Sequence, residues 1–466
     1  MKSDRLNILW YCTDQQRFDT IGALGNPYVR TPVIDSLVEN GVTFTHAYCQ
    51  SPICTPSRAS FMSGMYPSRV HNTRNGNATF PENTPLISKI IADQGYDCGM
   101  IGKFHLQSSG KRTEPRIKDD GFRYWKFSHA PRDDWPEGEH DYADWVREKG
   151  GDLTALRESP ERVPPQFHQT TWATDRAIEF IDEDRGDSPW MLNINVYDPH
   201  PPFEPPKVYE DQFSPDDMPG PHFEESDVEQ QAKLANADFQ PRGDMDAKEA
   251  QAKYYAMIAQ IDDQFGRLLD HLDKTGQREN TVIIFTSDHG ETLGDHGLMF
   301  KGCRFYEGLI RVPLIFSFPG YMAGTRCDQL VELLDLSATL LDIVDAPSPV
   351  HHQGESLISI IDGSVPPDTK IRDFVRCEYF DALASHFTGG TGAFATMHRS
   401  GRYKLSVYHS IGNVGELYDL EQDPWEHNNL WDCPNHQEIK SRLILESFNT
   451  HVNLTTDVGS ERIAPM

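Results

Sequence analysis

Five short apolar segments constrain the fold of this chain more than any other feature. They are continuously apolar rather than alternating, and they lie at residues 7–12, 98–101, 190–197, 281–286 and 312–316. Runs of this kind are typical of strands that are buried on both faces of a parallel sheet. We therefore expect these segments to be the central strands of one sheet.

Segments with a helical repeat lie between the predicted strands. Apolar residues follow a helical stripe from Tyr254 to Leu272, and Gly276 is placed to end that helix. Residues 86–94 and 330–344 show similar patterns. Because strands that alternate with helices form doubly wound sheets, the sequence predicts an α/β fold whose mixed, mostly parallel sheet is flanked by helices.

Two long segments interrupt this alternation. Residues 108–165 are rich in Trp, Arg, Asp and Pro, and residues 201–247 are acidic and rich in Pro. Loops of this length are usually functional or mobile, and inserts that act as lids over an active site would fit both segments.

The C-terminal part of the chain has a different pattern. Its predicted strands are shorter, as at residues 404–408, and a polar helix is predicted from residue 435. We expect one large N-terminal domain over residues 1–365 and a smaller α+β subdomain with an antiparallel sheet over residues 366–466.

The charge of the chain excludes one class of partner. The sequence has 71 acidic and 43 basic residues and a formal net charge of −28. Nucleic acid is not an expected partner, because a protein that follows a phosphate backbone needs a basic face. The same surplus of acid repels anionic substrates at long range, so any anion site must gather its own cations.

The N-terminus and the cysteines bear on the cellular compartment. No segment is apolar enough for a transmembrane helix, so we expect no membrane partner. Residues 1–5 are polar and the apolar run after them is too short for a signal peptide. This indicates a cytoplasmic protein, whereas a leader removed earlier would indicate a periplasmic or secreted one.

No sequence feature indicates the oligomeric state. The eight cysteines form no CxxC pair, which suits reduced thiols; they lie at positions 12, 49, 54, 98, 303, 327, 377 and 433.

Four predicted strands end in polar residues of the kind that binds ligands. These residues are Asp14 and Gln15 after the first strand, Lys103 and His105 after the second, Asp198 and His200 after the third, and Asp288 and His289 after the fourth. Ligand sites in open α/β sheets form beyond the carboxyl ends of the strands. The four strand ends together therefore predict one shared pocket.

Part of this set suits a cation. Asp14, Gln15 and Asp288 offer carboxylate and amide oxygens, which are the ligands that Ca²⁺ and Mg²⁺ prefer. His289 is a less usual ligand for Ca²⁺ and leaves Mn²⁺ or another metal open.

Cys54 is the only cysteine within a recognisable motif, Ser51-Pro-Ile-Cys-Thr-Pro-Ser-Arg58. Pro56 suits the first turn of a helix, so Cys54 is predicted to lie at a helix N-terminus. The free N–H groups and the helix dipole favour an anion there, and they lower the pKa of a thiol. A lone cysteine is more often a core residue, so the residues that flank Cys54 are what decide between core packing and a reactive thiol.

The string from Cys54 to Arg58, followed by Ala59-Ser60 and Gly64-Met-Tyr-Pro67, resembles the signature of the formylglycine-dependent sulfatases. The resemblance covers nearly the whole chain, because further family elements occur in the family order: Asp14, Gly102-Lys103-Phe104-His105, His200, Ser287-Asp288-His289-Gly290, Lys301 and residues 417–430. It implies an alkaline-phosphatase-like N-terminal domain and the activity of a sulfuric ester hydrolase.

The resemblance also implies a mechanism. A separate maturation enzyme would oxidise Cys54 to formylglycine, whose hydrated form attacks the sulfur atom of a sulfate ester. The matured Cys54 would share a divalent cation, Ca²⁺ with Mg²⁺ or Mn²⁺ as alternatives, with Asp14, Gln15, Asp288 and His289. Lys103 and Lys301 would bind sulfate oxygens, His200 would protonate the leaving alcohol, His105 would hydrogen-bond the nucleophile, and Arg58 would fix its position. Asp295 and His296 form a second acidic–histidine pair nearby, which we leave outside this set.

Two positions depart from the common family pattern and open an alternative. Many members have Asp in place of Gln15 and Asn in place of His289, and the forms found here resemble a bacterial branch that includes phosphonate monoester hydrolases. That branch has Tyr and Thr where Lys103 and His105 stand, so the sequence favours sulfate. A phosphonate monoester or phosphodiester hydrolase with the same nucleophile is the alternative. An inactive protein that binds sulfated glycans and a zinc-dependent phosphatase are weaker ones.

A sulfated carbohydrate is the expected substrate, with aryl sulfates as surrogates. The aromatic residues of the first insert either stack on sugar faces or anchor the insert to the core; they are Trp125, Trp135, His140, Tyr142 and Trp145. Three arginines of the same insert are candidates for binding a sugar carboxylate: Arg112, Arg116 and Arg132.

Overall fold

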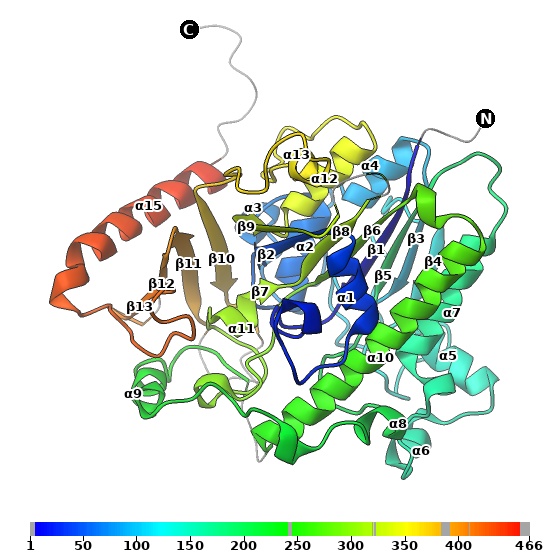
Figure 1. Ribbon diagram of the computed structural model, residues 1–466, viewed down its shortest axis with the longest axis horizontal. Helices are drawn as coiled ribbons and strands as arrows, with labels where there is room; N and C mark the ends of the chain where they lie inside the picture. Colours follow the sequence, from blue (N-terminus) through cyan, green and yellow to red (C-terminus); the bar gives the residue numbers. More distant parts are fainter. Residues whose placement is uncertain are drawn as a thin grey trace, which may run out of the picture.

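Two separate sheets organise the computed structural model, which describes residues 5–240, 245–318, 320, 323–383, 392–409 and 411–456 (Figure 1). The larger sheet has nine strands in the order β4-β3-β5-β1-β6-β8-β2-β7, with β9 paired to β2, and the smaller sheet has four. The strands of the larger sheet are β1 Asn7–Thr13, β2 Val42–Tyr48, β3 Asp97–Gly102, β4 Tyr124–Phe127, β5 Trp190–Asn195, β6 Thr281–Ser287, β7 Arg311–Val312, β8 Leu314–Ser317 and β9 Thr325–Glu332.

The larger sheet is mixed and mostly parallel, as predicted. The five strands from β4 to β6 are parallel to one another, whereas β8 pairs antiparallel with both β6 and β2. Strands β1, β5 and β6 are buried along their whole length. This burial explains why their sequences are continuously apolar.

Three details of the strand prediction were wrong. The predicted strand 312–316 is divided into β7 and β8 at Pro313, which has no N–H to donate to a neighbouring strand. The predicted strand 190–197 ends at Asn195. Residues 330–332 belong to β9, so the helix predicted over 330–344 is shorter and runs as α12 from Asp335 to Ile343.

Helices cover both faces of the larger sheet. One face of β1, with Trp10 at its centre, packs against α2 Cys54–Ser63, α4 Ile87–Asp93 and α12. The other face, with Tyr11, packs against α1 Pro32–Glu39, α7 Gln169–Asp182 and α10 Ala247–Lys274. The helix predicted from the stripe 254–272 is the central part of α10, which begins earlier because Asp246 accepts hydrogen bonds from the N–H groups of Lys248 and Glu249.

The two inserts contain more regular structure than their sequences suggest. Residues 108–165 contribute the edge strand β4 together with α5 Asp141–Glu148 and α6 Leu153–Glu158. Residues 201–247 contain α8 Lys207–Glu210 and α9 Glu225–Lys233. Three further short α-helices in the described residues are α3 Pro67–Val70, α11 Glu307–Ile310 and α13 Ile358–Ile361.

The smaller sheet is antiparallel and lies in the C-terminal part of the chain, as predicted. Its strands are β10 Phe374–Phe380, β11 Phe394–Ser400, β12 Tyr403–Tyr408 and β13 Gly415–Asp419, in that order. Helix α15, Gln437–Thr455, follows them and packs on β11 and β12. None of the helices in the described residues combines the length and apolarity that a membrane span requires.

Candidate active site

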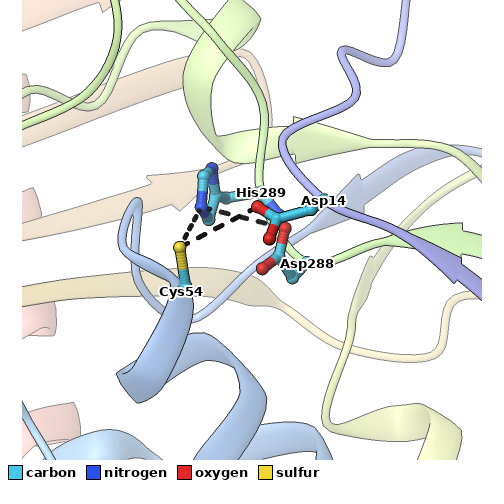
Figure 2. Close-up of side chains that lie close together, drawn as sticks. All are labelled: Asp14, Cys54, Asp288 and His289. Carbon is cyan, nitrogen blue, oxygen red and sulfur yellow. Dashed lines mark hydrogen bonds and ion pairs between the residues drawn. The ribbon is translucent and has the colours of Figure 1, made fainter. Parts of the chain in front are cut away.

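The carboxyl ends of four parallel strands meet at one edge of the larger sheet. In the register of the sheet, Cys12 of β1 and Gly102 of β3 both pair with Asn195 of β5, and Thr13 of β1 pairs with Ser287 of β6. The residues that follow these strands therefore lie side by side, as the sequence predicted. The N-terminus of α2 brings Cys54 to the same place, opposite Asp14, Asp288 and His289 (Figure 2).

Cys54 is the first residue of α2 and is 1% exposed. Its Sγ lies 3.0 Å from Lys301 Nζ, 3.4 Å from Lys103 Nζ and 3.2 Å from His289 Nε2. Burial alone would raise the pKa of this thiol, but the two ammonium groups and His289 hold the pKa well below its usual value. The acidic chain therefore has a local site built for an anion, and that site surrounds Cys54.

Four side chains at this point form a potential cation site. The ligand atoms of Asp14, Cys54, Asp288 and His289 lie within 4.8 Å of one another, and all four residues are buried. His289 Nδ1 donates to the Gly290 carbonyl oxygen at 2.8 Å, which leaves the Nε2 lone pair free to face the cluster. Burial would raise the pKa of Asp14, but Lys103 lowers it to about 2. An ionised carboxylate, a second carboxylate and an imidazole nitrogen fit a divalent cation.

Gln15 is held next to this cluster by two partners. Its Oε1 accepts a hydrogen bond from Lys301 Nζ at 2.7 Å, and its Nε2 donates to Glu291. Because Glu291 is fully buried and takes the amide N–H₂, it determines which end of the amide faces the site. The amide oxygen of Gln15 therefore lies on the side of Lys301.

Arg58 contacts both carboxylates of the cluster and the Lys103 backbone. Its Nε donates to Asp288 Oδ2 at 2.9 Å, its Nη1 donates to the Lys103 carbonyl oxygen at 2.6 Å, and its Nη2 lies 3.6 Å from Asp14 Oδ2. The ammonium of Lys103 in turn forms an ion pair with Asp14. Two buried cations thus balance two buried carboxylates, which limits the cost of burying either.

The two histidines predicted to be catalytic also lie beside Cys54. Both imidazoles form a hydrogen-bond contact with the Cys54 side chain. Burial, and then Lys103, lowers the pKa of His105 to about 4, while burial and Lys301 lower the pKa of His200. His200 Nδ1 donates to the Pro201 carbonyl oxygen at 2.6 Å, so its Nε2 is the nitrogen left for a ligand.

Several residues of the site were not predicted. Asn195 Oδ1 accepts from Arg58 Nη1 at 3.2 Å, and Asn75 Oδ1 accepts the N–H of Thr55 at 2.9 Å. Asn195 is the last residue of β5, and Glu291 follows the end of β6. The same argument from strand ends could therefore have identified both residues. Asn75 lies in a loop without any sequence signal of its role.

Most of the insert residues considered for substrate binding are either buried or paired with residues of the insert. Trp135, His140 and Tyr142 are 3%, 0% and 1% exposed, so they anchor the insert instead of offering a sugar platform. Arg112 and Arg132 both pair with Asp134, and Arg116 pairs with Asp120.

Comparison with known proteins gives consistent matches over most of the chain. The sulfatase family model matches residues 6–346, and a model described as N-sulphoglucosamine sulphohydrolase, C-terminal, matches residues 294–451. An arylsulfatase of Clostridium perfringens is 29% identical, with 94% of this chain and 92% of that protein covered. An N-acetylglucosamine-6-O-sulfatase of Bacteroides thetaiotaomicron is 24% identical, with 95% and 86% covered. The crystal structure of a phosphonate monoester hydrolase of Agrobacterium radiobacter superposes with a TM-score of 0.81 at 25% identity, with 97% and 96% covered.

Proposed function

Because this chain belongs to the sulfatase family and is therefore a sulfuric ester hydrolase, we propose that it removes sulfate from a carbohydrate through the matured side chain of Cys54. The observation that carries this proposal is the pair of lysine ammonium groups within 3.4 Å of Cys54 Sγ. One relative is named as an N-acetylglucosamine-6-O-sulfatase, and the alignment with it covers 95% of this chain and 86% of that protein. This similarity supports a carbohydrate as the substrate class.

Lys103 and Lys301 would bind the sulfate group. The position of Cys54 Sγ marks where the oxygen atoms of the matured residue would lie, so the two ammonium groups flank the point of attack. Positive groups that are held in place before the reaction stabilise the charge that develops on the sulfate oxygens. They also supply the local attraction that a chain with a net charge of −28 otherwise lacks.

Cys54 would require oxidation to formylglycine by a maturation enzyme, which is the one protein partner that the proposal implies. The hydrated aldehyde supplies a nucleophilic oxygen and a second hydroxyl that later releases the sulfate. Arg58 would hold the surroundings of this residue, since it contacts Asp288 and the Lys103 backbone directly.

Asp14, Gln15, Asp288 and His289 would hold the divalent cation, together with the matured Cys54. We infer Ca²⁺, with Mg²⁺ or Mn²⁺ as alternatives, because three of these four residues offer oxygen. When bound, the ion supplies positive charge to the nucleophilic oxygen and to a sulfate oxygen. Glu291 would keep the Gln15 amide in the orientation that ligation requires.

His200 and His105 would move protons in opposite directions. Since Nδ1–H donates a hydrogen bond to the Pro201 carbonyl oxygen, His200 in its charged form would carry the acidic proton on Nε2 and give it to the oxygen of the leaving group. The incoming sulfate would help to charge this imidazole, since it offsets the effect of Lys301. His105, with its pKa of about 4, is neutral near pH 7 and would accept the proton from the matured residue when sulfate is released.

The proposal is tested by mass spectrometry of the peptide that contains Cys54, combined with turnover assays. We expect the aldehyde in the active fraction, release of sulfate from nitrophenyl sulfate and from sulfated sugars, and loss of activity in Cys54→Ala. Cys433→Ala is the matched control, because Cys433 is half-buried near the C-terminal helix. Protein that keeps the thiol entirely and still turns over at full rate would contradict the mechanism.

A phosphonate monoester or phosphodiester hydrolase with the same nucleophile is the second candidate. It is favoured by the structural similarity to the phosphonate monoester hydrolase, with a TM-score of 0.81. Lys103 and His105 favour sulfate instead, because both are placed against the nucleophile. Matched nitrophenyl sulfate, phosphodiester and phosphonate esters separate the two, and faster turnover of the phosphonate would reverse the assignment.

A further inference from the structure

Outside the active site, three side chains from distant parts of the chain converge on one point. Asp227 lies in α9, His296 lies in the short 3₁₀ turn Asp295–Gly297, and His427 lies in the loop after β13. Their ligand atoms lie within 4.8 Å of one another. His296 Nδ1 is 2.8 Å from Asp227 Oδ1, and His427 Nδ1 is 3.1 Å from Asp227 Oδ2.

We propose that these three residues bind a second divalent ion of the Zn²⁺ type, separate from the ion of the active site. Two imidazole nitrogens and one carboxylate oxygen form a donor set that zinc and its neighbours prefer over Ca²⁺. With zinc–ligand bonds of about 2.0–2.2 Å, tetrahedral ligand atoms lie about 3.3 Å apart. The two nitrogen–oxygen separations, 2.8 Å to Asp227 Oδ1 and 3.1 Å to Asp227 Oδ2, lie within about half an ångström of that value.

The charge balance of Asp227 supports this site. Asp227 is 2% exposed and His296 is 3% exposed, yet the ion pairs of Asp227 within the described residues are with imidazoles only, and no lysine or arginine joins them. A buried carboxylate needs a compensating charge. A divalent ion supplies it, provided that each imidazole moves its proton from Nδ1 to Nε2 and so binds as the neutral ligand.

The surrounding contacts hold the ligands in place. The ring of Tyr306 stacks on His296 with centroids 3.6 Å apart and planes at 16°. Asp227 Oδ2 accepts the N–H of Glu224 at 2.8 Å, and the N–H of His427 donates to Asp423 Oδ1 at 3.1 Å. The His427 side chain is 14% exposed, so water can reach the fourth position from that side. Ligands oriented by such neighbours bind more tightly.

The ion would fasten three segments to one another. Figure 1 shows α9 at the lower edge of the molecule near the C-terminal sheet, and two hydrogen bonds join them: Gln230 Nε2 to Glu416 Oε1 at 3.0 Å, and Ser226 Oγ to the His427 carbonyl oxygen at 3.3 Å. His296 belongs to the segment that leads to Lys301. The site would therefore brace the insert 201–247 and the C-terminal sheet against the loop that carries a sulfate-binding lysine.

The test uses the full chain, stripped with a chelator, equilibrated with excess Ca²⁺ and then titrated with Zn²⁺. Elemental analysis should find one zinc per chain, and the Tm should rise by a few degrees at saturating zinc. The same zinc should remain in Asp288→Asn, which removes an active-site ligand, and its affinity should fall by roughly 100-fold in His427→Ala. His271→Ala is the matched control, because His271 forms an isolated pair with Asp182 at 2.7 Å on the surface.

A second measurement does not depend on the variants. Co²⁺ added to the Ca²⁺-saturated wild type should give the visible absorption of a four-coordinate ion, and Zn²⁺ should abolish it. Equal zinc uptake by His427→Ala and wild type, or no uptake by the wild type, would overturn the proposal. Asp227 would then only accept hydrogen bonds from the imidazoles of His296 and His427. Neither measurement uses sulfate release, so failure here leaves the sulfatase mechanism intact.

Discussion

Replacement of Lys301 by Met tests whether the Lys301 ammonium group is needed to bind sulfate beside Cys54. Lys301 is 2% exposed, and its Nζ lies 3.0 Å from Cys54 Sγ, 2.7 Å from Gln15 Oε1 and 3.3 Å from His289 Nε2. Methionine keeps a similar length and removes only the charge and the donors. In the proposed mechanism the ammonium faces the point where charge develops on the sulfate, so its loss should remove a stabilising group from a buried site.

The size of the effect follows from that placement. Loss of one such donor lowers kcat by about 10²–10³-fold, equivalent to about 2.7–4 kcal/mol. The effect on folding should be smaller, because loss of the hydrogen bond to Gln15, about 1–3 kcal/mol, is offset by removal of a buried charge. We therefore expect a strong loss of kcat/KM with a small change in Tm.

The assay compares kcat/KM for nitrophenyl sulfate, inhibition by inorganic sulfate, and Tm for wild type and Lys301→Met. Lys126→Met is the control. The Lys126 side chain is 37% exposed, and its ion pair with Asp141 is loose, with 3.6 Å between Nζ and Oδ1. Sulfate inhibition should weaken in Lys301→Met and not in the control. A decrease of less than about tenfold in kcat/KM, or unchanged inhibition by sulfate, would refute the assignment of Lys301.

Three further predictions concern the cation and the buried acids. Removal of divalent ions by a chelator should abolish turnover and Ca²⁺ should restore it; failure of Ca²⁺, Mg²⁺ and Mn²⁺ alike to restore it would exclude the proposed ligand set. Glu291→Gln should weaken the affinity for the activating cation by about 10–100-fold, measured by titrating the stripped protein, because Glu291 orients the Gln15 amide; unchanged affinity would show that Gln15 is not a ligand. Burial raises the pKa of Glu114 to about 7, above its unfolded value of about 4.3, so the wild type should lose stability as pH rises through this window. Glu114→Gln should flatten that loss in thermal melts between about pH 4 and about pH 7, and parallel curves for the two proteins would contradict it.

Much of the fold follows from local sequence, and the exceptions have physical reasons. Strands such as β1 and β6 are buried on both faces, so their side chains must be apolar and the run is visible in the sequence. Strand β2 was missed because its segment includes Thr43, Thr45 and His46, and it becomes a strand by pairing with β9, β8 and β7. Pairing between distant segments leaves little trace in either segment alone.

The side chains predicted from strand ends and from the motif at Cys54 do lie together in the structure. Parallel strands bring their carboxyl ends to one edge, so strand-end residues such as Asp14 and Asp288 are expected to lie together, and they do. The sequence was silent on how Arg58 joins two carboxylates and on how Glu291 sets the Gln15 amide.

The sequence by itself thus determined the layered α/β architecture, the acidic character of the chain and the candidate residues around Cys54, because these depend on patterns that lie within short segments. Only the tertiary structure decided which of those side chains touch, which insert aromatics are buried, and that Asp227, His296 and His427 converge. The reason is that each of these outcomes depends on the packing of segments far apart in the chain, where a side chain meets partners that its own neighbours in sequence do not specify.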